Sequence, residues 1–231
     1  MRRLPILLLL LHALSANSQD SMKIIYVYDA LCGWCYGFSP VITEMEKKYS
    51  SQIDFEVVSG GMVTGDRIGP IGEVAGYIKT AYKDVEKATG VEFGEQFLNQ
   101  TLEKGDAIFT SIPPAIAMVV FKSHKPEKQV EFAAALQKGI YYEGKEPSHY
   151  QMYGELARDF GLDSAAFIAQ IKDSKYEELA YKEFQMAASL GVRGFPTVFI
   201  LKDGRYEQIS HGYTPMAAFE KRITDYLDEK K

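Results

Sequence analysis

The stretch Lys23-Ile24-Ile25-Tyr26-Val27-Tyr28-Asp29-Ala30-Leu31-Cys32-Gly33-Trp34-Cys35 decides the fold, because a strand pattern changes into a helix pattern within it. Residues 23–28 are mostly β-branched or aromatic, which predicts a buried strand. Helical spacing begins at Cys32 and continues through the apolar residues Phe38, Val41, Ile42 and Met45. Two cysteines three positions apart therefore lie where a strand gives way to an amphipathic helix.

The segment that follows completes a parallel βαβ unit. The run from Ile53 to Val58 predicts a second strand, and Gly60-Gly61 ends it. A strand, a helix and a strand are the minimum for two parallel strands joined by a crossover. We expect Pro40 to kink the helix near its start, because proline lacks the backbone N–H that a helix uses.

The strand pattern returns after Gly191. In Phe195-Pro196-Thr197 a proline interrupts an otherwise apolar pattern, which indicates either a cis peptide bond or a trans proline at a strand start. Asp203-Gly204 then predicts a hairpin to a strand that ends at Ile209. Thr214-Pro215 predicts the N-cap and first position of a last helix, which carries the apolar residues Phe219, Ile223 and Leu227.

The middle of the chain is almost entirely helical from Asp66 to Leu190 and has no convincing strand. Pro113-Pro114 suits the first turn of a helix that starts near Ala115. We expect the apolar stripes of this region to form a core rather than a cofactor site. The stripes are Val74, Ile78, Tyr82 and Val85; Val130, Ala133, Leu136 and Ile140; and Met152, Leu156 and Phe160.

These patterns predict an α/β fold of the order βαβ…ββα with a large all-helical insertion. Residues 19–65 and 191–231 form the α/β domain, and residues 66–190 form the insertion domain. In this 231-residue chain, apolar residues are 46% and charged residues 25% of the composition, which is typical of a globular protein. The formal charge of -5 and the lack of a basic stripe argue against nucleic acid as a partner.

The N-terminus has the pattern of a secretory signal peptide over residues 1–18. Arg2 and Arg3 precede an apolar run that is too short for a bilayer, which needs roughly 20 residues. The alternative is an intracellular chain that starts at Met22. We therefore expect a periplasmic or secreted protein if the leader is real and a cytoplasmic one otherwise, with no membrane span after leader removal.

The two cysteines are the only ones in the chain, so the pair has no other thiol to bridge. Unpaired N–H groups at a helix N-terminus stabilise a thiolate, which predicts Cys32 as the exposed, reactive thiol and Cys35 as the buried one. Cys35 would then resolve a mixed disulfide at Cys32. Zinc would need further ligands, and no two histidines have a paired spacing, so we predict no metal and no cofactor.

Together these motifs resemble the DsbA branch of the thioredoxin superfamily. The segment from Asp29 to Gly37 is most similar to the FrnE-like proteins. The resemblance implies a thioredoxin-like fold, with Pro196 as a cis-proline facing the disulfide and Phe195 offering backbone to an extended substrate. It also puts the Gly212 loop, with His211, beside the site. We expect these two residues, together with Trp34 and Thr197, to contact substrate.

One departure concerns the dipeptide between the cysteines. DsbA has Pro-His there and this chain has Gly33-Trp34, so the oxidising power cannot be transferred from the resemblance. Trp34 either offers an exposed apolar surface to substrates or packs on Tyr36 or Phe38.

The leading functional hypothesis is thiol–disulfide exchange with protein substrates, supported by a redox partner protein or glutathione. One alternative is a glutathione-dependent isomerase of small aromatic or polyketide-like compounds, although such relatives typically lack the second cysteine. Another is a non-catalytic module that binds unfolded chains. Only the binding module would tolerate loss of Cys32.

Overall fold

Four strands form one mixed sheet in the order β2-β1-β5-β6. β1 runs parallel to β2 and antiparallel to β5, and β5 pairs antiparallel with β6. The computed structural model describes residues 22–228, so the predicted signal peptide lies outside the described residues. The strands are β1 (Lys23–Tyr28), β2 (Asp54–Ser59), β5 (Thr197–Lys202) and β6 (Arg205–His211).

The predicted βαβ…ββα order is confirmed, and so is the hairpin between β5 and β6. Asp203 and Gly204 at its turn have φ angles of 53° and 73°. Asp and Gly adopt this left-handed conformation more easily than other residues, which is why the dipeptide signals the turn. The domain boundaries at 65/66 and 190/191 stay a prediction.

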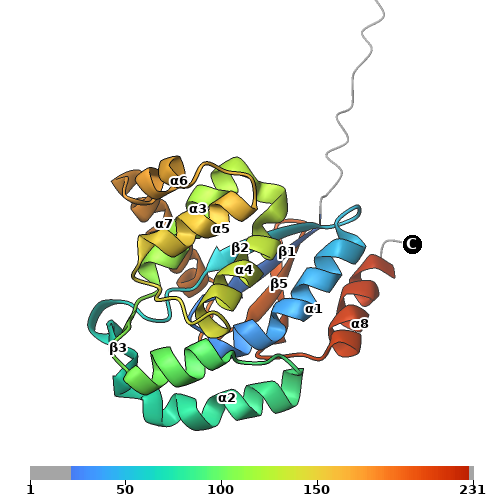
Figure 1. Cartoon of the computed structure of the whole chain (residues 1–231). Coiled ribbons are helices and arrows are strands. Elements are labelled where there is room, and N and C mark those ends of the chain that lie inside the picture. The colour runs from blue at the N-terminus through green and yellow to red at the C-terminus, as the bar shows by residue number, and fades with distance from the viewer. Residues whose placement is uncertain (1–21, 229–231) are drawn as a thin grey trace, which may run out of the picture.

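Helices surround the sheet, with α1 lying between α8 and the other helices (Figure 1). Residues Phe97–Leu102 form a short π-helix. The α-helices are α1 (Gly33–Tyr49), α2 (Ala75–Thr89), α3 (Ile112–His124), α4 (Gln129–Tyr141), α5 (Tyr150–Asp159), α6 (Ser164–Ile171), α7 (Ser174–Ser189) and α8 (Met216–Asp228).

Alternation along β1 explains how both faces of the sheet are covered. Tyr26 and Tyr28 belong to the core that contains α1 and α8 residues. Ile25 and Val27 point the other way and pack with Ala187 of α7. Both sets are buried, so β1 is a central strand with two apolar faces.

The helical region departs from the sequence prediction in one respect. Two short strands, β3 (Gly69–Pro70) and β4 (Ile108–Phe109), pair antiparallel within it, although no strand was expected there. Two-residue strands are too short to show an alternating pattern. The predicted stripe on α2 is also wrong at Val74, which is 51% exposed and lies just before the helix begins.

Two helix starts differ from the predicted ones. α3 begins at Ile112, so Pro113-Pro114 lies inside its first turn. α8 begins at Met216, one residue later than expected. The Thr214 hydroxyl pairs with the Ser210 hydroxyl at 2.7 Å instead of capping the helix. The kink expected at Pro40 stays a prediction, and α1 continues through this residue.

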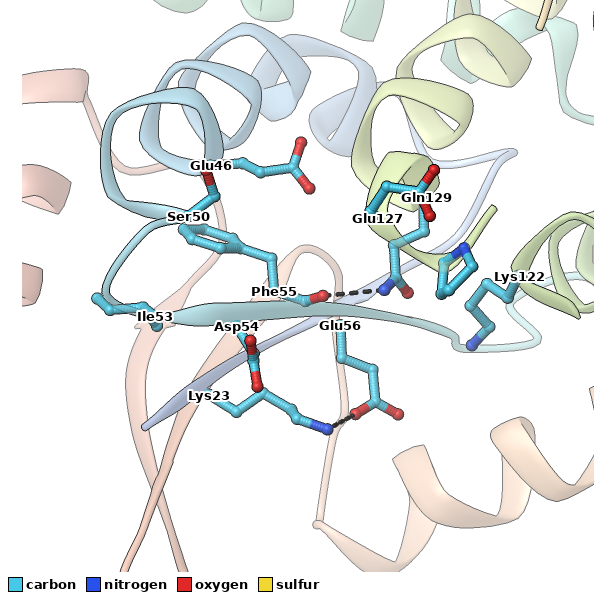
Figure 2. Close-up of a pocket in the computed structure, with 11 residues that line it drawn as sticks. Lys23, Glu46, Ser50, Ile53, Asp54, Phe55, Glu56, Lys122, Glu127 and Gln129 are labelled. Carbon is cyan, nitrogen blue, oxygen red and sulfur yellow. Dashed lines mark hydrogen bonds and ion pairs between the residues drawn. The ribbon is translucent and has the colours of Figure 1, made fainter. Parts of the chain in front are cut away.

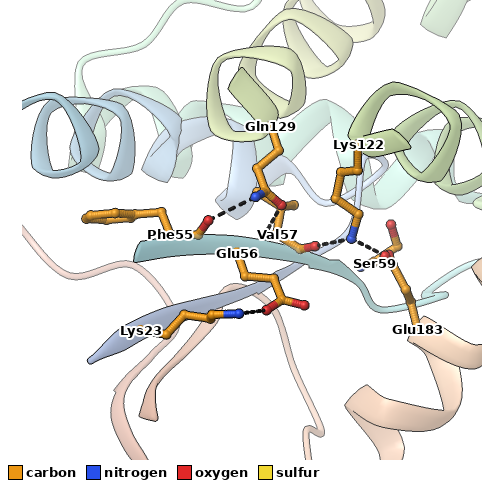
Figure 3. A network of polar contacts seen from close by, with 8 residues as sticks. All are labelled: Lys23, Phe55, Glu56, Val57, Ser59, Lys122, Gln129 and Glu183. Carbon is orange, nitrogen blue, oxygen red and sulfur yellow. Dashed lines mark hydrogen bonds and ion pairs between the residues drawn. The ribbon is translucent and has the colours of Figure 1, made fainter. Parts of the chain in front are cut away.

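β2 is an edge strand whose outer backbone groups are bonded to side chains rather than to another strand (Figure 3). Gln129, the first residue of α4, accepts the Val57 N–H at 2.8 Å and donates to the Phe55 carbonyl at 2.9 Å. One amide side chain thus occupies the place that a neighbouring strand would take.

An ion pair between two helices continues this bonding toward the end of β2 (Figure 3). Lys122 of α3 donates to the Val57 carbonyl at 2.8 Å and pairs with Glu183 of α7. Glu183 in turn accepts the Ser59 N–H at 2.8 Å. Helices from the predicted insertion therefore hold the strand that leads to the loop at Gly60.

Candidate active site

Cys32 forms the N-cap of α1. Its backbone is extended, with φ −94° and ψ 110°, and its sulfur accepts the Cys35 N–H at 3.3 Å. The thiol donates to the Phe195 carbonyl oxygen at 3.5 Å. Because the helix N-terminus presents partial positive charge, a thiolate that forms at Cys32 is stabilised there.

Cys35 lies one helical turn further along and is fully buried. Its exposure is 0%, against 6% for Cys32, and both are free thiols. Burial, together with the hydrogen bond and charge of Cys32, raises the pKa of the Cys35 thiol well above its usual value. The expectation that Cys32 is exposed is wrong, because Cys32 is buried and its sulfur lies against the Phe195 carbonyl.

The proline loop lies against Cys32. The peptide bond between Phe195 and Pro196 is cis, and Pro196 is buried. The Gly212 N–H donates to the Pro196 carbonyl at 2.7 Å, and the Thr197 hydroxyl donates to a carbonyl within the loop at 2.8 Å. The fold thus brings these four predicted site residues together beside the first cysteine.

Gly60 makes room for the Phe195 ring. A Cβ atom on Gly60 would lie 2.0 Å from the ring, which is far inside van der Waals contact. A glycine at the end of β2 is therefore required for Phe195 to lie beside Cys32 as it does.

Trp34 and His211 lie around this centre rather than in it. Trp34 is half-buried, and its ring centroid is 6.4 Å from that of Tyr213, an aromatic residue that the sequence prediction did not name. His211 is exposed, and its ring lies against Gly194, where an added Cβ would be 3.4 Å away. Both residues lie at the border of the site, whereas the proline loop contacts the Cys32 sulfur directly.

Asp29 is a site residue that the sequence prediction missed. Its buried carboxylate accepts the Leu31 N–H at 2.9 Å, the Met62 N–H at 2.7 Å and the Ser111 hydroxyl at 2.9 Å. Burial raises the pKa of Asp29, and these hydrogen bonds oppose the shift. A carboxylate directly after a buried strand was the available signal, because such a group needs partners.

Two residues of α4 also lie at the site, and the sequence prediction missed both. Gln137 is fully buried and donates to the Asp29 and Cys32 carbonyls at 3.3 and 3.5 Å. Tyr141 is buried, and burial followed by the charges of Cys32, Asp29 and Cys35 raises its pKa well above the usual value. Nothing in the sequence marks these two residues, because their roles depend on how α4 packs on α1.

A cavity lies at the other end of the sheet (Figure 2). It has a volume of about 540 Å³ and is lined by residues that include Lys23 and Asp54, the first residues of β1 and β2. The dithiol follows the other end of β1, about 20 Å away for a six-residue strand. This cavity is therefore separate from the cysteine site.

The described part of the chain offers no group of three or more His, Cys, Asp or Glu residues that could hold a metal ion. Among residues 22–228 there is also no helix with the length and apolar character to cross a membrane.

Comparison with known proteins places this geometry in a family. The model of the DSBA-like thioredoxin domain matches residues 23–224. A candidate protein disulfide isomerase from Nitrosomonas europaea has 25% identity and a TM-score of 0.81, covering 92% of this chain and 100% of its own. The cytosolic disulfide reductase DsbM from Pseudomonas aeruginosa has 26% identity and a TM-score of 0.76, covering 90% and 98%. A structure of DsbM with GSH has 25% identity and a TM-score of 0.74, covering 90% and 100%.

A search of the curated proteins finds no match. The thioredoxin-like fold and the family match define a redox enzyme of the thiol–disulfide class. The chain belongs to the DSBA-like thioredoxin domain family. The narrower FrnE-like assignment stays a prediction.

Proposed function

We propose that the chain exchanges disulfides with protein thiols, with Cys32 as the nucleophile and Cys35 as the resolving thiol. One observation carries the proposal. The Cys32 sulfur caps α1 and lies 3.3 Å from the Cys35 nitrogen, while the Cys35 side chain is buried behind it. Cys32 keeps a small exposed fraction of 6%, whereas Cys35 has none, so a partner's sulfur would meet Cys32 first.

In the reducing direction, the Cys32 thiolate attacks a substrate disulfide, forms a mixed disulfide and releases one substrate thiolate. Cys35 then loses its proton and attacks the Cys32 sulfur, which releases the second substrate thiolate. Two electrons pass from the dithiol to the substrate. In the oxidising direction the same steps run backward, with two substrate thiols giving up their protons and electrons.

Cys35→Ser tests this mechanism because it keeps the nucleophile and removes the resolving thiol. In cell extract the variant should accumulate larger, reductant-sensitive adducts that are absent from the matched Cys32→Ser variant. Protein adducts support exchange with protein substrates. Wild-type turnover by Cys35→Ser, without adducts, would contradict the two-cysteine mechanism.

Glutathione is the second candidate partner, and the DsbM structure with GSH supports it. Adducts of Cys35→Ser with glutathione alone would favour a glutathione-dependent reaction on small molecules over exchange with proteins. If neither kind of adduct forms and Cys32→Ser keeps full function, the chain acts as a binding module.

We further propose that residues 1–18 direct export, which would favour oxidation or isomerisation of exported proteins. A reporter enzyme fused after residue 18 should be found outside the cytoplasm. Retention of the reporter in the cytoplasm would favour a start at Met22 and a reductase.

A further inference from the structure

Tyr26 carries a buried hydroxyl that has no hydrogen-bond partner among the described residues and lies near the two cysteines. The residue is 1% exposed. A buried hydroxyl without a partner loses its hydrogen bonds to water and destabilises the fold, so its presence calls for an explanation.

The Tyr26 ring is fixed against the helix face that carries Cys35. Its centroid is 5.4 Å from that of Tyr28 and 5.9 Å from that of Phe38. Phe38 lies one turn after Cys35 on α1, and both side chains are fully buried on the same face. Tyr26 therefore lies between β1 and the face of α1 that carries Cys35.

A hydrogen bond from the Asp29 backbone lowers the pKa of the Cys35 thiol, and the other polar side chains near Cys35 are already committed. The Asp29 carboxylate accepts the three donors described above, and the Gln137 amide nitrogen donates to two carbonyls. The Gln137 amide oxygen has no partner, but it can only accept a hydrogen bond and so cannot stabilise a thiolate.

We propose that the Tyr26 hydroxyl is the hydrogen-bond donor that stabilises the Cys35 thiolate during resolution of the mixed disulfide. The inference rests on the proposed function. Burial raises the pKa of Tyr26 well above its usual value, and the charges of both cysteines raise it further, so the phenol keeps its proton. Tyr26 only donates a hydrogen bond, and the Cys35 proton leaves to solvent.

Ellman's reagent separates the two chemical steps. Attack by Cys32 breaks the aryl disulfide, forms a mixed disulfide and releases one thionitrobenzoate. Attack by Cys35 on the Cys32 sulfur then closes the protein disulfide and releases the second thionitrobenzoate. Stopped-flow absorbance records both releases in the reduced wild-type protein, and Cys35→Ser gives the first release alone.

Tyr26→Phe should leave the first rate unchanged and slow the second by about tenfold or more, since it removes a hydrogen bond to a charged group. Tyr153→Phe is the matched control, because Tyr153 is equally buried but its hydroxyl donates to the Pro147 carbonyl. It should leave both rates unchanged. An unchanged second rate in folded Tyr26→Phe overturns the role of Tyr26 and leaves the proposed function intact.

Incorporation of 3-fluorotyrosine at position 26 covers the case in which Tyr26→Phe does not fold. The more acidic phenol is a stronger donor, so the second release should become faster, and an unchanged or slower release overturns the inference. A wild-type protein that releases only one thionitrobenzoate would overturn the proposed function and this inference with it.

Discussion

The ion pair between Lys122 and Glu183 should contribute measurably to stability. Both side chains are mostly buried, with exposures of 18% and 13%. Lys122→Met removes the donor to the Val57 carbonyl and leaves the Glu183 carboxylate without its cation. Breaking such a pair from one side costs about 3–5 kcal/mol, and the remaining solvent contact favours the lower value, about 3 kcal/mol.

Glu183→Gln is the milder change, because an amide oxygen can still accept the Ser59 N–H. We expect a loss of about 1.5 kcal/mol in the free energy of unfolding. The double variant should lose less than the sum, by a coupling of about 1.5 kcal/mol, because the second change no longer leaves a buried charge unpaired.

Urea unfolding of the wild type, both single variants and the double variant measures this coupling, with unchanged m values as the test that the comparison is valid. Lys221→Met serves as the control, since Lys221 pairs with Asp225 on the exposed surface of α8 and should contribute less than about 0.5 kcal/mol. Additive losses in the double variant would refute the idea that the pair acts as a buried unit.

Three further results are expected. Iodoacetamide should modify Cys32 before Cys35 in the reduced protein, because Cys35 is fully buried, and faster labelling of Cys35 would reverse the proposed roles. Emission of Trp34, the only tryptophan, should rise on reduction because a disulfide quenches a nearby indole, and identical spectra would mean that no disulfide forms beside it. Burial, followed by the charge of Glu131, raises the pKa of Glu46 to about 7, above its ordinary 4.5, so this group favours folding at low pH and the benefit is lost as pH rises from about 4.5 through 7. Glu46→Gln should therefore raise the free energy of unfolding at pH 8 by about 1 kcal/mol after allowing for solvent screening, and urea unfolding that shows no gain at pH 8 relative to pH 5 would contradict this.

The sheet and its turns were predictable because local physics determines them. The β-branched and aromatic run of β1, the cysteines at the strand-to-helix junction and the Asp203-Gly204 turn each carry their own signal in a few residues. The two-residue strands β3 and β4 carry none, because they form only when distant segments of the helical region meet.

The sequence predicted only those site residues whose roles follow from their own positions in the chain. The cysteine pair and the proline loop could be read from their positions in the chain. Gln137 and Tyr141 could not, because both lie at the site only through the packing of α4 on α1. A buried glutamine in a helix has the same sequence pattern as an exposed one, so only packing distinguishes them.

β2 is bonded to Gln129, Lys122 and Glu183. The α/β fold and the helical region are therefore not independent units, although their order in the chain suggests that they are. The helices that supply those three side chains lie between two halves of the α/β fold in the sequence. A shortened chain without them would carry unsatisfied backbone groups along one border of its sheet. Such a chain could recruit a second copy strand against strand and so begin to polymerise.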